Sequence, residues 1–186
     1  MPKNISKLRV SLIAISAIAV LALLPAGASA ACNGGGLTSA QVDMCTPTPK
    51  ARLLSNGMLI PPKSAPTRVK RVIAYANKIR NKPYIYGGGH RRWFDRGYDC
   101  SGSVSFALRG GKFLSSPMPS GPLARWGMRG KGRWISVYAN PGHTYAVIAG
   151  YRWDTSGNSG GKTGPSWHKD LRSTSGSFAV RHPAGF

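Results

Sequence analysis

The apolar pattern of this chain changes from a helical period to a strand-like one near its middle, which limits the folds available to it. Between residues 69 and 79, apolar side chains recur at spacings of three and four residues and so share one face of a helix that ends by Pro83. Later segments predict strands, with turns at 140–142 and around Gly150: residues 133–138, 144–149, 151–154 and 177–181. Helices followed by an antiparallel sheet predict an α+β fold, with the N-terminal helices packed on a central sheet.

The first thirty residues have the features of an export signal. Three basic residues precede a mostly apolar run from Val10 to Leu24, and Ala28-Ser29-Ala30 forms a small-residue cleavage site. This run is shorter than the roughly 20 apolar residues of a membrane span. We therefore expect residues 1–30 to be removed and the protein to be secreted, extracellular or cell-wall associated, without stable membrane insertion. Cys32 leaves a lipoprotein open, although the usual leucine three positions upstream is missing.

Proline and glycine punctuate residues 31–65, which predict an N-terminal extension or linker before one domain at 66–186. Residues 115–132 and 154–164 predict loops for the same reason. Cys32 and Cys45 could pair as a disulfide in an oxidising compartment, leaving Cys100 as the single free thiol. The alternative is that Cys100 is a buried small hydrophobe and the N-terminal cysteines are unpaired.

The chain is strongly basic, with 26 Lys and Arg against 5 acidic residues, all aspartate, and a formal net charge of +21. Such a charge attracts polyanions. With an export signal, anionic cell-wall polymers are the expected partner, although the charge could serve solubility alone. Nucleic acid is not expected, because the basic residues are scattered and no nucleic-acid-binding motif is present. We also expect a monomer without cofactor or metal, since Cys32 and Cys45 lack zinc-ligand spacing.

Cys100 stands before an apolar stretch that predicts a short helix ending at Gly110-Gly111, and His143 begins a predicted strand. A helix N-terminus and an imidazole both favour the thiolate, which is the nucleophilic form of cysteine. A third polar group usually orients the imidazole. Asp154 is the first candidate because the hairpin that carries His143 returns through it, although Asp154 could instead make an ordinary turn. His168 and His182 are the other candidates.

Three sequence elements together resemble the NlpC-type family of papain-like cysteine peptidases. They are Pro83-Tyr84 followed by Gly87-Gly88, then Asp99-Cys100-Ser101-Gly102, then Gly142-His143 before a Val-Ile-Ala-Gly strand. The resemblance spans roughly Val69 to Asp154. Members of this family act on bacterial cell-wall peptides, typically at the bond between D-glutamate and a diamino acid.

The resemblance implies a role for each matching residue. Cys100 would be the nucleophile, His143 the base, and the third polar position falls at or near Asp154. Tyr84 would help to stabilise the oxyanion, and Asp99 and Ser101 would line the substrate pocket. The chain would thus be a secreted cysteine peptidase that cleaves the peptide stem of peptidoglycan through a thioester intermediate.

The chain also differs from the family pattern. Residues 134–138 replace the common Pro-Gly-Asp-Leu, Thr144-Tyr145-Ala146 follows the histidine where Val-Gly-Ile is usual, and the third polar residue is more often histidine. Two alternatives therefore stay open: a catalytically inactive cationic wall-binding protein of the same fold, and a related wall amidase. His90 is interpreted as a loop histidine that could touch substrate, and Trp93 and Trp126 as possible groove walls.

Overall fold

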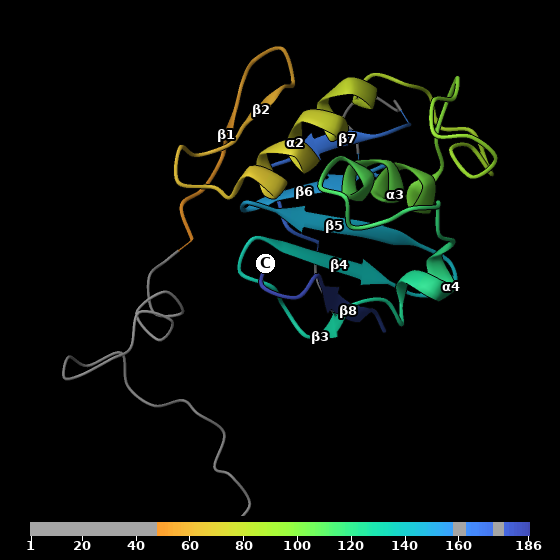
Figure 1. Ribbon diagram of the computed structural model, residues 1–186. Coiled ribbons are helices and arrows are strands. Elements are labelled where there is room, and N and C mark those ends of the chain that lie inside the picture. The colour runs from red at the N-terminus through yellow and green to blue at the C-terminus, as the bar shows by residue number, and fades with distance from the viewer. Residues whose placement is uncertain (1–47, 158–162, 173–176) are drawn as a thin grey trace, which may run out of the picture. The chain divides into compact units, whose positions relative to one another are not determined.

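A six-stranded antiparallel sheet forms the centre of the computed structural model, which describes residues 48–157, 163–172 and 177–186 (Figure 1). The strand order is β3-β8-β4-β5-β6-β7, so the C-terminal strand β8 inserts between β3 and β4. The bounds are β3 Met128–Arg129, β4 Ile135–Ala139, β5 Thr144–Ile148, β6 Tyr151–Asp154, β7 Ser166–His168 and β8 Ala179–His182. Apolar residues of the central strands β4 and β5 form much of the core.

Two helices pack against each other and cover part of one face of the sheet. These are α2 (Thr67–Ile79) and α3 (Cys100–Gly110), and α3 also contacts β5 and β6 (Figure 1). Gly110 permits the close helix contact, because a Cβ there would lie 2.5 Å from the Arg71 carbonyl oxygen of α2. The predicted α+β fold, with N-terminal helices on an antiparallel sheet, is confirmed.

Short elements interrupt the segment from 115 to 132, which was predicted to be a loop. It contains the single-turn helix α4 (Ser120–Leu123) as well as β3. Leu123 is fully buried and so fixes α4 to the core, but one apolar residue in four gives no detectable period. The described residues include no helix long and apolar enough to cross a membrane.

Part of the predicted extension packs on the folded domain. β1 (Arg52–Leu53) and β2 (Leu59–Ile60) form a small antiparallel hairpin, and Leu59 is fully buried in the core. The boundary at residue 65 stays a prediction, as do the signal at 1–30 and the Cys32–Cys45 bridge, because residues 1–47 lie outside the described part of the chain.

A buried asparagine ties this hairpin and β7 to α2. The Asn77 side chain accepts hydrogen bonds from the Leu59 N–H (3.0 Å) and the Trp167 indole N–H (2.9 Å), and donates to the Leu59 carbonyl (2.9 Å). Asn77 lies on the apolar face of α2, where it satisfies groups from both flanking elements. Asn77 thus provides hydrogen-bond partners for buried backbone groups of β2 that would otherwise have none in the apolar face of α2.

Replacing Asn77 with leucine should destabilise the fold. Two backbone groups and one indole N–H would lose their partner, and each buried polar group left unpaired costs about 1–3 kcal/mol. We expect the free energy of unfolding in urea to fall by about 3 kcal/mol. The exposed Asn81→Leu variant is the matched control and should stay near the wild type. Equal stability of the two variants would contradict this role.

Candidate active site

Cys100 is the first residue of α3, with Asp99 as the N-cap. The Asp99 carboxylate accepts a hydrogen bond from the Gly102 N–H at 2.7 Å, which satisfies one of the free donors of the first turn. The Cys100 side chain is almost buried, with 8% of its residue surface exposed. The sulfur therefore lies at the positive end of the helix, where a thiolate is favoured.

A glycine loop packs directly on this first turn of α3. A Cβ at Gly102 would lie 2.1 Å from the Gly88 carbonyl oxygen, and a Cβ at Gly88 would lie 2.4 Å from the Gly97 carbonyl oxygen. The Asp99 carboxylate also accepts from the Gly87 N–H at 3.1 Å. Gly88 and Gly102 are thus explained by close backbone contact that leaves no room for a side chain, whereas Gly87 has a positive φ of 72°.

The turn between β4 and β5 places His143. The Asn140 side-chain oxygen accepts from the backbone N–H groups of Gly142 (2.9 Å) and His143 (2.8 Å), and the Asn140 N–H donates to the His143 carbonyl at 3.0 Å. The predicted turn at 140–142 is present, and its asparagine fixes the residue just before β5. Asparagine ahead of Pro-Gly is the sequence signal for this arrangement.

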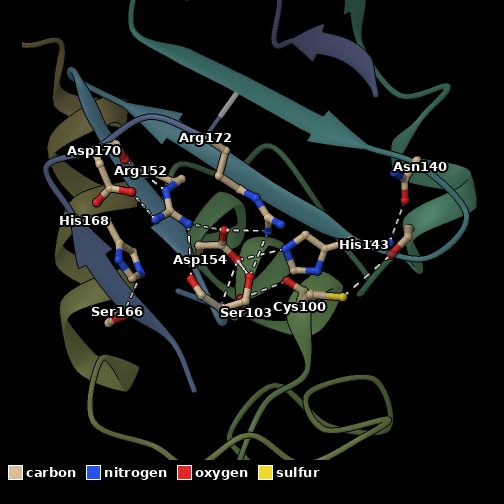
Figure 2. A network of polar contacts seen from close by, with 12 residues as sticks. Cys100, Ser103, Asn140, His143, Arg152, Asp154, Ser166, His168, Asp170 and Arg172 are labelled. Atoms are coloured by element: carbon tan, nitrogen blue, oxygen red, sulfur yellow. Dashed lines mark hydrogen bonds and ion pairs between the residues drawn. The ribbon is translucent and has the colours of Figure 1, made fainter. Parts of the chain in front are cut away.

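The hairpin of β5 and β6 brings Asp154 to His143. Ala149 and Gly150, with φ of 48° and 85°, make the tight turn, and the pairing of Ile148 with Tyr151 follows at once. The start of β5 and the end of β6 therefore lie side by side at the open end of the hairpin. There the His143 Nε2 lies 2.9 Å from the Asp154 Oδ1, and Figure 2 shows the imidazole between Asp154 and Cys100.

Cys100 and His143 interact directly at the junction of α3 and β5. Burial raises the pKa of the Cys100 thiol, but hydrogen bonds from His143 and the Thr144 N–H outweigh it and lower the pKa below its usual value. Burial likewise disfavours the charged His143, yet its bonds to Asp154 and Cys100 raise the imidazole pKa to about 9. Both shifts act towards a thiolate beside an imidazolium, and His143 is protonated at neutral pH.

Two arginines hold the Asp154 carboxylate, and sequence reasoning missed both. Arg152, 2% exposed, donates to the Asp154 Oδ2 at 2.5 Å, and Arg172 donates to the same oxygen at 3.3 Å. Burial raises the pKa of Asp154, but hydrogen bonds and charges from His143 and Arg152 lower it by more, so that the pKa is about 2. Alternation along β6 puts residues 152 and 154 on one face, which is the signal that could have identified Arg152.

The other predicted site residues lie close to Cys100. Burial and the nearby charges of Cys100 and Asp99 raise the pKa of Tyr84, which keeps its hydroxyl protonated at neutral pH. Ser101 is buried and donates to Asp99 at 3.1 Å, and the His90 Nε2 lies 3.0 Å from the same carboxylate. Asp99 thus holds the glycine loop to α3. Its role with Ser101 in substrate binding stays a prediction.

The remaining histidine candidates have other neighbours. His168 pairs with the Ser166 hydroxyl at 3.0 Å, and a ring nitrogen of His182 lies 3.1 Å from the Pro183 carbonyl oxygen. Asp154 is the group that contacts His143, so it stays our prediction for the orienting residue. Within the described residues, no three His, Cys, Asp or Glu side chains are grouped to hold a metal ion.

Comparison with known proteins gave matches among solved structures only. No family model and no curated protein matches the chain. RipD from Mycobacterium tuberculosis, described as a non-catalytic NlpC/p60 domain protein adapted to peptidoglycan binding, matches with a TM-score of 0.48 and 18% identity over 63% of this chain and 98% of its own.

Two further structures from the same organism match. The peptidoglycan hydrolase RipB has a TM-score of 0.48 and 26% identity over 66% of this chain and 68% of its own. A protein described as a hypothetical invasion protein has a TM-score of 0.46 and 18% identity over 61% of each chain. All three TM-scores lie below 0.5, and the functional inference therefore rests on this chain's own residues and geometry.

The alkylation of Cys100 by iodoacetamide should reveal its lowered pKa. We expect the midpoint of the rate against pH to lie below that of free cysteine in the same buffers. A second change should follow at about pH 9, where His143 loses its proton. His143→Gln should move the midpoint up towards the free-cysteine value. A wild-type midpoint at or above that value would contradict an activated thiol.

Asp154→Asn should lower kcat/KM by far more than the loss of one hydrogen bond would. An asparagine lacks the charge that favours the imidazolium, so the His143 pKa should fall, and the peptide hydrolysis proposed below should slow by roughly 10³–10⁴-fold. Asp170→Asn is the matched control, because Asp170 pairs with the same Arg152 at 2.8 Å but is 74% exposed. It should retain activity within about twofold, as exposed ion pairs contribute little. Comparable kcat/KM losses in both variants would refute the orienting role.

Proposed function

We propose that this protein is a secreted cysteine peptidase that hydrolyses an amide bond in the peptide stem of bacterial peptidoglycan. The observation that carries the proposal is the contact of Cys100 with His143 and of His143 with Asp154 at the N-terminus of α3. A buried thiol with a lowered pKa, an imidazole and an ionised carboxylate in this order are the parts of a thiol nucleophile.

In the first half of the reaction, the Cys100 thiolate attacks the carbonyl carbon of the amide. The resulting tetrahedral intermediate carries its negative charge on the former carbonyl oxygen. His143, protonated at neutral pH, donates its proton to the leaving nitrogen, the C–N bond breaks, and the amine departs. The acyl group remains on the sulfur as a thioester.

The oxyanion needs donors that are already in place before the reaction. The Cys100 N–H is at the first helical position, where no acceptor exists within the helix. The Tyr84 hydroxyl is the second proposed donor, since the charge of Cys100 reaches it and its raised pKa keeps it protonated. Loss of one such donor typically costs about 3 kcal/mol of transition-state stabilisation.

The second half of the reaction restores the enzyme. His143, now neutral, takes a proton from water, and the resulting hydroxide attacks the thioester carbonyl. Collapse of this intermediate breaks the C–S bond and releases the carboxylic acid and the Cys100 thiolate, with His143 again protonated. Asp154 stabilises the imidazolium in both halves and keeps its Nε2 engaged, so that Nδ1 is directed at the sulfur.

The choice of a cell-wall substrate comes from the sequence. The three elements around Tyr84, Cys100 and His143 resemble the NlpC-type family, and the net charge of +21, to which residues 1–30 contribute only Lys3, Lys7 and Arg9, suits an anionic wall. The predicted export signal at residues 1–30 would deliver the protein to that compartment. Together they favour the peptide stem over other amide substrates.

The direct test is the release of amino groups from purified peptidoglycan under reducing conditions. The wild type should release them, and Cys100→Ala should abolish release while binding to the insoluble wall persists. The Cys32→Ser/Cys45→Ser double variant also removes thiols but keeps Cys100, so it is the matched control and should retain release.

Two other results would replace the proposal. A wild type that binds the wall but releases nothing would be a cationic wall-binding protein. Mass spectrometry of the digested fragments separates the remaining alternatives, because a cut between two amino acids identifies a peptidase and a cut at the glycan–peptide link identifies an amidase.

A further inference from the structure

A cavity of about 700 Å³ lies at the end of α3, and its described lining residues include neither Cys100 nor His143. Residues from α2, from the loop before α3 and from the segment that follows α3 line it. Its volume lies in the range of sites that hold a small molecule. The lining combines two kinds of side chain: the cations Arg71, Arg109 and Lys112, and the aromatic rings of Tyr75, Trp93 and Phe113.

The charges of this cavity lack a counter-charge. No aspartate is among its described lining residues. The Arg109 guanidinium lies 4.6 Å from the centre of the Trp93 ring, and its Nη1 is buried without a hydrogen-bond partner among the described residues. A cation held against an aromatic ring and partly removed from water attracts an anion more strongly than a solvated one. The wall of the cavity thus favours a negatively charged ligand.

The shape of the cavity is fixed by the backbone and not by mobile side chains alone. Tyr98 donates its hydroxyl to the Trp93 carbonyl at 2.6 Å and so holds the loop that carries Trp93. Gly110 sits against α2, where it leaves no room for a Cβ between Arg71 and Tyr75. Lys112 adopts a left-handed backbone conformation, with φ of 57°, immediately after the helix. The backbone that carries these residues is therefore held before any ligand arrives, and the Arg109 guanidinium is held against the Trp93 ring.

We propose that this cavity is a binding site for an anionic sugar unit, separate from the site of hydrolysis. Arginine matches phosphate and carboxylate groups through paired N–H donors. Each aromatic ring has a cation of this chain over one face, so a sugar would meet the remaining apolar face or edge of the ring. The site would hold an acidic glycan of the wall. Its occupation does not depend on Cys100, so it stands even where the proposed hydrolysis fails.

Calorimetric titration of the full-length protein at physiological salt tests the site. The probes are glucose 1-phosphate, glucuronate, glucose and inorganic phosphate. At least one of the two sugar acids should bind saturably, and glucose and phosphate should each bind at least tenfold more weakly. Tighter binding of glucose 1-phosphate than of glucuronate identifies a phosphate-bearing polymer as the source of the ligand. Tighter binding of glucuronate identifies a carboxylate-bearing glycan. Cys100→Ala should bind the same probe unchanged.

Charge-matched double variants separate a built site from the overall positive field. Arg71→Gln/Lys112→Gln removes two exposed cations of the cavity and should weaken binding of the sugar acid at least tenfold. Arg52→Gln/Arg129→Gln removes two exposed cations elsewhere on the described chain and should stay within twofold. Thermal unfolding confirms that both variants fold. Equal weakening in the two variants, tight binding of phosphate alone, or no saturable binding of either acid would overturn the proposal.

Discussion

The buried carboxylate of Asp154 is the group on which the arrangement of Cys100 and His143 depends. It has no exposed surface, and it receives donors from His143, Arg152 and Arg172. Removing a carboxylate from water is costly unless hydrogen bonds and opposite charges compensate for it. Here the hydrogen bonds and positive charges outweigh the cost of burial, so the Asp154 carboxylate stays ionised. Its negative charge then raises the pKa of the His143 imidazole. Together with the Cys100 contact, this buried charge raises the pKa of His143, and His143 and the Thr144 N–H in turn lower the pKa of Cys100.

The sequence predicted the elements that carry a repeating apolar pattern. The α2 helix and the strands β4 to β6 were found within one or two residues of their observed ends, because each has several apolar positions at a regular spacing. The β1–β2 hairpin, α4, β3 and β7 have two to four residues each and no such pattern. They exist because of tertiary contacts, such as the hydrogen bonds of Asn77 to Leu59 and Trp167, which no local propensity encodes.

The residues at the centre of the candidate site could be predicted from the sequence, but the arginines that hold Asp154 could not. Cys100, His143 and Asp154 were named from motif spacing and hairpin geometry, and the structure brings all three together. Arg152 and Arg172 were not named: alternation puts Arg152 on the same strand face as Asp154, but in a chain with 26 Lys and Arg residues this does not show which arginine is buried. Only the fold distinguishes the buried Arg152, which faces a carboxylate, from the many arginines that face water. Polar supports of this kind depend on pairs of residues that meet only after folding.

The contact between Gly88 and Gly102 makes the position of the Cys100 sulfur independent of the side chains that project from the glycine loop. The backbone of the glycine loop rests directly on the backbone of α3, so the position of the sulfur is set by main-chain atoms. Side chains that project from the same loop, such as Tyr86 at 90% exposure, take no part in that contact. Substitutions there can change which molecules are accepted without moving the nucleophile. Under the proposed function, the chain could therefore vary its recognition of substrate over evolutionary time while the position of the Cys100 sulfur stays constant.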